Sequence, residues 1–516
     1  MKYTVVSSAE YTYPDIWEYA GASREISVFS ARDSYATFQV LLGDRNDAQV
    51  TVHFQGLPEG CAAQVFTLTP VRVEKNHNIA PENYQAHYPE RIAPYWLYDC
   101  LRPFDGTLDL TDGVGGVYVS LPISADTAPG DYVGSMTVDG EEIPLQLTVY
   151  PVTVPQESLK VIVGFSEPIC ASYHGVKHLS EEYYRIEEQY LAMLRRMRQN
   201  MMYTGGISSK RVGENKWEFD FSKFVAQVKR YEAAGMRYFN APAIGWRKSW
   251  EESTILLNGV GLPAMSYEGF CYLTQYLPAL RQVLLENGWI DRFVMGIADE
   301  PNEKNATEFR ALCGLVRKLL PEVKLIDAIE YGDFYGALDI WVPRNEKYDR
   351  KTEQIEMLRA DGSELWYYVC CGPRTTPGYI NRFMDYPLLS TRYLHWANYK
   401  YNMKGFLHWA ANVYQPGQDP FTVNCPEHHN ADRVCFLPPG DTHIIYPGKG
   451  APWMSIRLEA ERESAEEYEL LCELAKRDKD KADAICNRVF HSFRDVEYDV
   501  ALFTENKKAL LEALCK

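Results

Sequence analysis

The sequence predicts a multidomain chain: an N-terminal antiparallel β-sandwich, a (β/α)8 barrel of the TIM type, and a C-terminal helical extension packed on the barrel. Three observations predict this order. Residues 1–155 contain short β-rich runs between turn residues, residues 156–478 alternate strand-like runs with amphipathic helices, and residues 479–516 have a helical pattern. With 516 residues, 46% of them hydrophobic, the chain can bury more than one sizeable core.

The sandwich prediction rests on β-rich runs that lack helical periodicity and are separated by turn residues such as those at 43–47. The irregular, aromatic stretch 88–99 is expected to be a long loop, either packed on itself, which we favour, or reaching toward the next domain. The segment Tyr150-Pro-Val-Thr-Val-Pro155 is expected to be a stiff linker, because two prolines fix φ and remove backbone donors. The predicted strands lie at 25–30, 36–42, 50–54, 116–121, 128–138 and 144–150.

The barrel prediction rests on eight strand-like runs, most of them followed by a helical pattern with one apolar face. The connection between the fifth and sixth runs is short for a helix. The predicted strands lie at 159–165, 201–203, 237–242, 292–300, 323–330, 339–343, 364–370 and 405–412. The predicted helices lie at 181–199, 220–235, 267–286, 306–320, 352–359, 379–401 and 455–476.

The fourth strand, Arg292-Phe-Val-Met-Gly-Ile-Ala-Asp-Glu-Pro301, ends in two carboxylates, Asp299 and Glu300. Pro301 cannot donate to a strand ladder, so the strand is expected to stop at Glu300. In α/β-barrel enzymes the catalytic residues lie at the carboxyl ends of the barrel strands, although many strands simply end in polar residues. Adjacent residues on a regular strand point to opposite faces, so the two carboxylates can share a site only if the backbone leaves strand geometry there.

Other polar and aromatic residues follow the remaining strands, and together they suit a carbohydrate: rings stack on sugar faces, while amides and carboxylates bind hydroxyls. The chain has no phosphate-binding glycine loop and no GxSxG motif. The run Glu427-His-His429 has no partner at metal-binding spacing and is read as a solvated loop, so no metal or cofactor is expected. The residues expected at the mouth are Asn240, Asp299, Glu300, Glu330, Tyr348, Tyr367, Tyr368, Trp409 and Asn412.

The formal net charge of −17 argues against nucleic acid as a partner, because polyanions need a cationic footprint. No apolar run is long enough for a transmembrane helix, and the N-terminus does not read as a secretory signal. The twelve cysteines show no CxxC spacing, which is typical of free thiols in a reducing compartment. We therefore expect a cytoplasmic protein without a membrane partner; a homo-oligomer is compatible with the sequence.

Several motifs in this order resemble glycoside hydrolase family 123, the β-N-acetylgalactosaminidases. They are the Asp-Glu-Pro at 299–301, Trp341-Val-Pro, Leu365-Trp-Tyr-Tyr-Val, Arg392-Tyr-Leu-His-Trp, Gly405-Phe-Leu-His-Trp-Ala-Ala-Asn and the late Tyr446-Pro-Gly followed by the Ser455 helix. The resemblance implies substrate-assisted hydrolysis, in which the 2-acetamido oxygen of the sugar is the nucleophile. It implies that Asp299 stabilises the acetamido group and that Glu300 is the general acid/base.

For the acetamido pocket and the sugar platform we predict Tyr348, Trp366, Tyr368, Trp409 and Asn412, each of which has a core role as its alternative. The expected substrate is an oligosaccharide or glycoconjugate with a terminal N-acetylhexosamine. Departures from the family pattern, including Ile297-Ala298 before the acidic pair, leave the sugar and its linkage open.

Two alternatives remain at this stage. One is a conventional two-carboxylate glycosidase that uses Glu300 with Glu330 or Asp327 and needs no acetamido group. The other is a sugar-binding protein on a barrel that has lost catalysis, because fold alone does not imply function.

Overall fold

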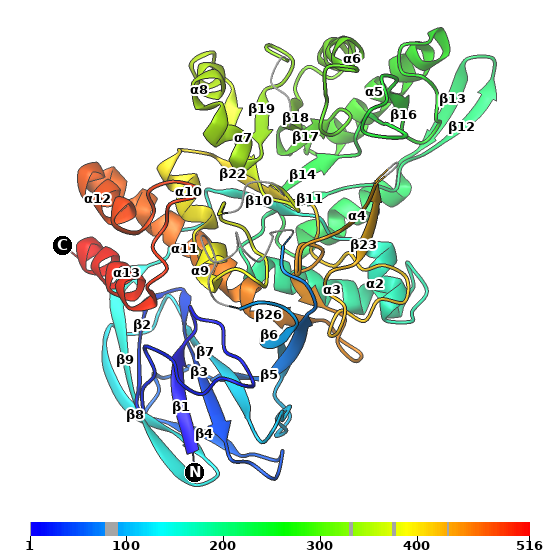
Figure 1. Cartoon of the computed structure of the whole chain (residues 1–516). Helices are drawn as coiled ribbons and strands as arrows, with labels where there is room; N and C mark the ends of the chain where they lie inside the picture. The colour runs from blue at the N-terminus through cyan, green and yellow to red at the C-terminus, as the bar shows by residue number, and fades with distance from the viewer. Residues whose placement is uncertain (1, 78–90, 330–333, 374–377, 431–432, 516) are drawn as a thin grey trace.

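The computed structural model describes residues 2–77, 91–329, 334–373, 378–430 and 433–515 (Figure 1). The N-terminal part is a sandwich of two sheets whose facing sides enclose an apolar core that includes Val40, Val119 and Leu147. One sheet has the order β1-β3-β7-β5-β6-β26-β25 and the other β2-β9-β8-β4, in which β2 pairs with β9 in parallel. The strands from this part are β1 (Lys2–Ser7), β2 (Ile26–Arg32), β3 (Ser34–Gly43), β4 (Val52–Gln55), β5 (Gln64–Val73), β6 (Tyr95–Pro103), β7 (Gly115–Ile123), β8 (Gly130–Val138) and β9 (Glu141–Thr153).

Strand β6 corrects one expectation. The stretch 88–99 was predicted to be a loop, but Tyr95 begins a strand that pairs with β5; residues 78–90 lie outside the described part. Pro94 precedes the strand, where the missing N–H costs no ladder bond. Buried Tyr95 and Leu97 then alternate with exposed Trp96, as in a strand with one face on the core.

The second part is a barrel of parallel strands, and all eight predicted strands are present. One sheet has the order β11-β14-β17-β18-β19-β20 and the other β10-β22-β21, with only Trp366 separating β20 from β21. The strands are β10 (Lys160–Val163), β11 (Met201–Tyr203), β14 (Tyr238–Ala241), β17 (Phe293–Gly296), β18 (Lys324–Ile329), β19 (Ile340–Pro343), β20 (Glu364–Leu365), β21 (Tyr367–Tyr368) and β22 (Gly405–His408).

Asn200 links β10 to β11 and so closes the ring of strands. Its backbone N–H donates to the Val161 carbonyl at 3.4 Å, and its side-chain oxygen accepts from the Val161 N–H at 3.2 Å. Its side-chain amide donates to the Leu159 carbonyl at 2.8 Å. A buried amide therefore bridges a gap that a regular ladder leaves open.

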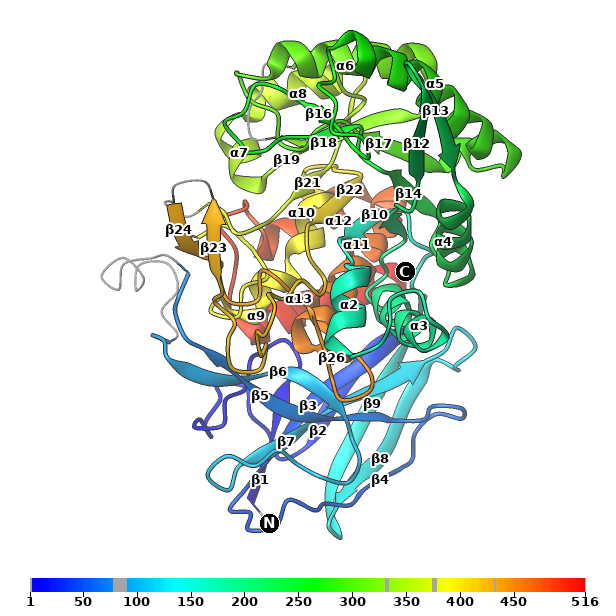
Figure 2. The same cartoon turned by 90° about the vertical axis from the view of Figure 1, so that its right-hand side faces the viewer.

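Helices cover the outside of the barrel (Figures 1 and 2). They are α2 (Glu167–Tyr173), α3 (Glu181–Arg196), α4 (Ser222–Ala233), α5 (Tyr267–Glu286), α6 (Ala306–Leu319), α7 (Asn345–Arg350), α8 (Thr352–Ala360), α9 (Leu388–Arg392) and α10 (Leu394–Lys400). A projecting hairpin, β12 (Ser208–Gly213) and β13 (Lys216–Asp220), was not predicted; it lies beside α5.

The long helix predicted at 379–401 is wrong in its first half. Residues 379–387 are not helical, and only α9 and α10 form. Pro387 disfavours helical geometry in the residue before it, which explains why α9 begins only after it. The preceding backbone instead bonds to distant segments, with Ile380 donating to the Phe493 carbonyl and Met384 to the Pro439 carbonyl.

Helix α11 (Ile456–Arg477) lies between the sandwich and the barrel (Figure 2). Glu466 accepts from Ser34 of the sandwich at 2.6 Å, and Glu469 accepts from the Leu159 N–H beside the barrel at 3.0 Å. Just before the helix, β26 (Trp453–Ser455) joins the sandwich sheet by pairing with β6, and β25 (Ile445–Tyr446) extends that sheet. The two parts therefore share a sheet as well as a helix.

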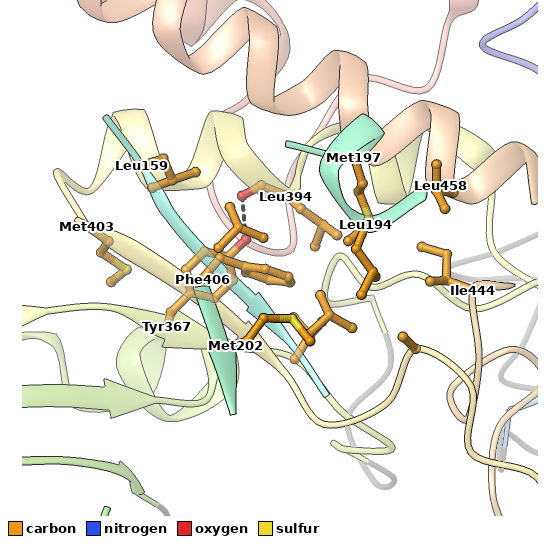
Figure 3. Packing of buried hydrophobic residues seen from close by; sticks show 14 of the residues in the cluster. Leu159, Leu194, Met197, Met202, Tyr367, Leu394, Met403, Phe406, Ile444 and Leu458 are labelled. Atoms are coloured by element: carbon orange, nitrogen blue, oxygen red, sulfur yellow. Dashed lines mark hydrogen bonds between the residues drawn. The ribbon is translucent and has the colours of Figure 1, made fainter. Parts of the chain in front are cut away.

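The C-terminal helices α12 (Lys479–Val489) and α13 (Val500–Leu514) pack against α11. Figure 3 shows how Leu458 of α11 joins the apolar core formed by Leu194, Met202 and Phe406 around the barrel strands. In the described residues, none of the helices is both long and apolar enough to cross a bilayer.

Candidate active site

The backbone leaves strand geometry before the acidic pair, Asp299 and Glu300. Strand β17 ends at Gly296, so the prediction that it continues to Glu300 is wrong. The next two N–H groups, of Ile297 and Ala298, donate to Oδ2 of Asp327 at 3.1 and 3.0 Å instead of to a neighbouring strand. A side chain of β18 therefore takes over the role of the ladder at this point.

Both members of the acidic pair adopt the left-handed backbone region, with φ of 48° at Asp299 and 39° at Glu300. Non-glycine residues rarely occupy this region, and each such residue costs free energy that the surrounding structure must supply. The strict alternation of strand side chains no longer applies there. The backbone therefore leaves strand geometry at Asp299 and Glu300, as it must if two adjacent carboxylates are to share one site.

Arg247 holds this strained turn. Its Nη2 donates to the carbonyl of Asp299 at 2.6 Å and to that of Glu300 at 2.9 Å, and its Nη1 donates to the carbonyl of Trp250 at 2.8 Å. The pKa of the Arg247 guanidinium is lowered overall, because burial outweighs the opposing effect of the carboxylates of Asp299, Glu300 and Asp327. A half-buried cation thus faces the backbone of the acidic pair and lies within the field of three acids.

Tyr368 reaches Glu300 from across the barrel mouth. It ends β21, the seventh barrel strand, and its hydroxyl donates to Oε1 of Glu300 at 2.8 Å. Tyr368 is 3% exposed, so its phenol is fixed by packing. The hydrogen bond brings together a residue after strand four and a residue of strand seven, both of which were expected at the barrel mouth.

Asp299 is exposed to solvent, yet the surrounding protein raises the pKa of its carboxyl group, while Arg247 lowers it. A group that water can reach, but that protein encloses strongly enough to disfavour its charge, is suited to meet a ligand. Tyr203, at the end of β11, keeps part of its side chain exposed to solvent. The protein around its phenol raises the pKa of that group, and the charges of Asp299 and Asp327 raise it further.

Asp327 is a third carboxyl group at this site. It is 7% exposed, and burial first, then the charge of Asp299, raises its pKa to about 7. Hydrogen bonds from the backbone of Ala298, Ile297 and Asp299 oppose that shift. Asp327 therefore supports the turn beneath the acidic pair.

Two predicted substrate contacts lie elsewhere. Tyr348 is buried on α7, where its hydroxyl donates to Glu356 of α8 at 2.8 Å. Trp366 is fully buried between β20 and β21, and its indole N–H donates to Glu364 at 2.7 Å. Both side chains face packed protein and offer no surface to a sugar in this structure.

Trp409 and Asn412, both after β22, have different settings. Trp409 is half-buried, so part of its ring stays accessible, and its Nε1 donates to Asp441 at 3.1 Å. Asn412 is fully buried and fastens the turn after β10: its Oδ1 accepts from the Ser166 N–H at 2.8 Å and its Nδ2 donates to the Ser166 carbonyl at 3.1 Å. The Asn412 amide is thus occupied by backbone, whereas Trp409 as a sugar platform stays a prediction.

Glu330, the carboxylate considered for a conventional mechanism, lies outside the described residues. Asn240 lies beneath the acidic pair, where its Oδ1 accepts from the Gly296 N–H at 3.3 Å. Within the part of the chain that the structure describes, no three His, Cys, Asp or Glu side chains form a cluster that would hold a metal ion.

Arg247 is the functional candidate that sequence reasoning missed. The signal was present but weak: a cation between two tryptophans, Trp246 and Trp250, in the long loop after the third barrel strand. Its importance lies in two hydrogen bonds to carbonyl groups, and no sequence pattern encodes those. Asp327 was considered only as a nucleophile, whereas the structure gives it a supporting position.

Taken together, the parallel barrel and the adjacent carboxylates at its mouth, backed by a tyrosine and an arginine, are characteristic of a glycosidase. Residues 166–474 match the catalytic domain of glycoside hydrolase 123. This match covers more than half of the sequence, and the chain belongs to glycoside hydrolase family 123.

Comparison with solved structures agrees. A family 123 glycoside hydrolase from Clostridium perfringens, described for glycolipid glycan hydrolysis, aligns over 99% of this chain and 98% of its own, with a TM-score of 0.74 and 14% identity. The two proteins share a fold along their whole lengths.

More distant matches include a β-galacturonidase from Eisenbergiella tayi, with a TM-score of 0.37 and 9% identity over 90% of this chain and 97% of its own. A family 5 mannosidase from Rhizomucor miehei has a TM-score of 0.36 and 10% identity over 64% and 95%. Similarity at that level supports no argument about this chain. A comparison with curated protein sequences gave no match.

Proposed function

We propose that this family 123 glycoside hydrolase is an exo-acting, retaining enzyme that releases terminal β-linked N-acetylgalactosamine by substrate-assisted hydrolysis. The observation that carries the proposal is the acidic pair: two consecutive carboxylates, both in left-handed backbone, at the carboxyl end of barrel strand four. Substrate-assisted hydrolysis needs two neighbouring carboxylates with different tasks and no protein nucleophile.

In the first step, the acetamido oxygen attacks the anomeric carbon, and the bond from that carbon to the leaving oxygen breaks. Glu300 gives its proton to the leaving oxygen, so the aglycone departs as an alcohol and an oxazoline forms. Asp299 orients the acetamido group and balances the positive charge that develops on it. In the second step, water attacks the anomeric carbon and the bond from that carbon to the acetamido oxygen breaks, which restores the acetamido group. Glu300 takes a proton from the water, and the sugar is released with retained configuration.

The contacts of the acidic pair support this division of roles. Tyr368 donates to Oε1 of Glu300 and so helps to orient the carboxyl group that we assign as the general acid/base. Asp299 combines exposure with a raised pKa, so a cationic intermediate would gain more from its charge there than in bulk water. Arg247 donates to the backbone carbonyls of both acids and so fixes the turn that carries the two carboxyl groups.

The conventional mechanism has less support. Asp327 is buried, and one of its oxygens already accepts two backbone N–H groups, so it is poorly placed to attack an anomeric carbon. Glu330→Gln separates the two schemes: substrate-assisted hydrolysis should proceed at nearly the wild-type rate in this variant, while a mechanism that depends on Glu330 should fail.

We further propose that the natural substrates include glycans of glycolipids with a terminal N-acetylgalactosamine. This extends to the present chain what is described for the Clostridium perfringens enzyme, which shares its fold. The net charge of −17 favours neutral glycans over acidic ones.

The test is turnover of aryl β-glycosides of N-acetylgalactosamine, N-acetylglucosamine and galactose by wild type and Asp299→Asn. We expect release from the first substrate alone, with kcat reduced by about 10²- to 10³-fold in the variant because a carboxylate that stabilises charge is lost. Release from the galactoside would contradict the mechanism. Binding of N-acetylgalactosamine without turnover would favour a sugar-binding protein instead.

A further inference from the structure

A loop from the third barrel strand runs beside the acidic pair. The Gly245 N–H donates to the Ile297 carbonyl at 2.8 Å, and Arg247 donates to the carbonyls of both acids. Further along, the Asn302 side chain donates to the Trp250 carbonyl at 2.6 Å. Residues 245–250 therefore follow residues 297–302 step by step.

This loop carries two exposed indoles, Trp246 (43% exposed) and Trp250 (40% exposed). By contrast, Trp341, Trp366 and Trp396 in the barrel part are at most 2% exposed. Exposing two large aromatic rings gives up favourable burial, and exposed aromatics beside a site point to binding.

The loop is anchored on both sides of Trp250, so the rings sit on an ordered support. The side chain of Glu308, on α6, accepts from the Ile255 N–H at 2.8 Å, and that of Asn305 donates to the Glu252 carbonyl at 3.3 Å. Glu251 forms an ion pair with Lys304. A platform held in this way loses little entropy when a ligand stacks on it.

We propose that Trp246 and Trp250 form a platform for the sugar on the leaving-group side of the scissile bond. This inference rests on the proposed function. In an exo-acting enzyme the terminal sugar occupies the enclosed end of the site, and the rest of the glycan projects toward solvent. Exposed rings at the rim, one and three residues away from the arginine that holds the acidic pair, are placed to stack on the next sugar.

The chemistry of the ligand follows from the rings. A pyranose presents an apolar face of C–H groups, and an indole offers a flat surface to match it. The platform therefore selects glycans in which N-acetylgalactosamine is joined to a second sugar over simple alkyl glycosides. Specificity of this kind appears in kcat/KM because the contact is made outside the reacting ring.

The experiment compares two substrates that share the reacting sugar: the methyl β-glycoside of N-acetylgalactosamine and a β-linked N-acetylgalactosaminyl-galactose disaccharide. For Trp250→Ala and Trp246→Ala we expect the ratio of kcat/KM, disaccharide over methyl glycoside, to fall roughly 5- to 10-fold, as expected for the loss of a stacking contact. Trp250→Phe should restore most of the ratio. The matched control is Trp96→Ala, an indole of equal exposure (41%) on β6 of the sandwich, which should leave the ratio unchanged.

An unchanged ratio in both loop variants would overturn the platform. So would a loss seen only with glycolipid in vesicles and not with the free disaccharide, because the rings would then contact lipid. If wild type cleaves neither substrate, the proposed function has failed, but calorimetry can still test the platform. Trp250→Ala should bind the disaccharide more weakly than wild type does, and equal affinities of the two proteins would contradict the platform.

Discussion

At the scale of single residues, the site depends on a backbone conformation that its residue types disfavour. Asp299 and Glu300 both have positive φ, and three side chains from other segments hold them there: Arg247, Asp327 and Tyr368. Strain of this kind persists only where the surroundings specify it, and it concentrates at functional sites.

Removing the arginine should affect catalysis more than binding. In Arg247→Ala the carbonyls of the acidic pair lose two charge-assisted hydrogen bonds, so the carboxylates drift from their working positions. We expect kcat to fall by about 10- to 100-fold with KM changed much less. Steady-state kinetics on an aryl N-acetylgalactosaminide measure this, with Arg281→Ala, on the outer face of α5, as the control. Loss confined to KM would contradict a positioning role for Arg247.

Removing the phenol that bonds Glu300 should move the pH profile. A donated hydrogen bond stabilises the charged form of a carboxyl group, so Tyr368→Phe leaves Glu300 protonated to higher pH. We expect the basic limb of the pH dependence of kcat/KM to shift upward. Tyr367→Phe is the matched control, because the neighbouring phenol is buried and donates to the Leu394 carbonyl on α10. A shift of equal size in both variants would contradict the assignment.

The acidic pair itself was predictable at this scale, because two carboxylates and a proline after a buried apolar run stand out in the sequence. The residues that contact the substrate were harder to predict from the sequence. Tyr348 and Trp366 lie in motifs near strand ends, yet their rings point into packed protein, and sequence does not record which way an aromatic side chain faces. Arg247 works through carbonyl groups, so its role becomes visible only in three dimensions.

At the scale of elements, short apolar runs between turn residues predicted every barrel strand, including 201–203 with its bounds. The hairpin β12–β13 was missed because β12 is mostly polar and exposed. The alternation in β13, where Trp217 and Phe219 pack against Tyr272 of α5, spans only five residues. The false helix at 379–387 has the opposite cause: its apolar side chains suggested a helix, but buried irregular backbone bonds to distant segments instead.

Helix α11 combines a helical sequence with an unusual environment, since its acidic side chains are buried in ion pairs. Arg392 of α9 bonds both Glu463 and Glu467, and Lys507 of α13 lies 3.0 Å from Glu463. Removing one partner of such a cluster leaves buried charge without compensation.

Arg392→Met should therefore lower the free energy of unfolding by about 3–5 kcal/mol, measured by urea denaturation. The control is Lys476→Ala on α11 itself, whose exposed ion pair with Glu473 should contribute less than about 1 kcal/mol. Equal effects of the two substitutions would contradict the view that α11 is stabilised by its buried ion pairs.

At the scale of the whole molecule, the sandwich and the barrel are joined rather than merely linked, since β26 follows the barrel and completes the sandwich sheet. The order sandwich, barrel and C-terminal helices was predictable from the change in periodicity along the chain. The return of β25 and β26 to the first sheet was not, because pairing between segments about 350 residues apart leaves no local pattern.

Three buried carboxyl groups give the molecule a characteristic pH dependence. Burial raises the pKa of Asp327, Asp385 and Glu461 to about 7 each, from usual values of 3.8, 3.8 and 4.5. Between pH 5 and 7 the folded state holds more protons on these groups than the unfolded state does. These three groups therefore make the free energy of unfolding fall as pH rises through this window, and their effect levels off above the folded pKa. The buried histidines His395, His408 and His443 act in the opposite direction, because burial lowers the pKa of each imidazole.

Asp385→Asn tests this directly, because it keeps an oxygen that can accept from the His77 N–H while removing the titration. We expect the Tm of Asp385→Asn, taken relative to wild type, to rise from pH 5 to 7, because the variant lacks one group whose loss of a proton destabilises the folded state. Exposed Asp105, whose pKa is lowered by its bond to Arg102, titrates below this window, so Asp105→Asn should show the same pH dependence as wild type. A difference in Tm between Asp385→Asn and wild type that stays constant from pH 5 to 7 would contradict the raised pKa of Asp385.

The measurement that tests the central claim most directly is the rate of hydrolysis along a series of aryl β-N-acylgalactosaminides with acetyl, monofluoroacetyl, difluoroacetyl and trifluoroacetyl groups. Fluorine withdraws electrons from the acyl oxygen and weakens it as a nucleophile. Substrate-assisted hydrolysis by Asp299 and Glu300 predicts that kcat falls steeply at each step. A kcat that stays constant along the series would show that the acyl oxygen does not attack and would contradict the mechanism proposed for this site.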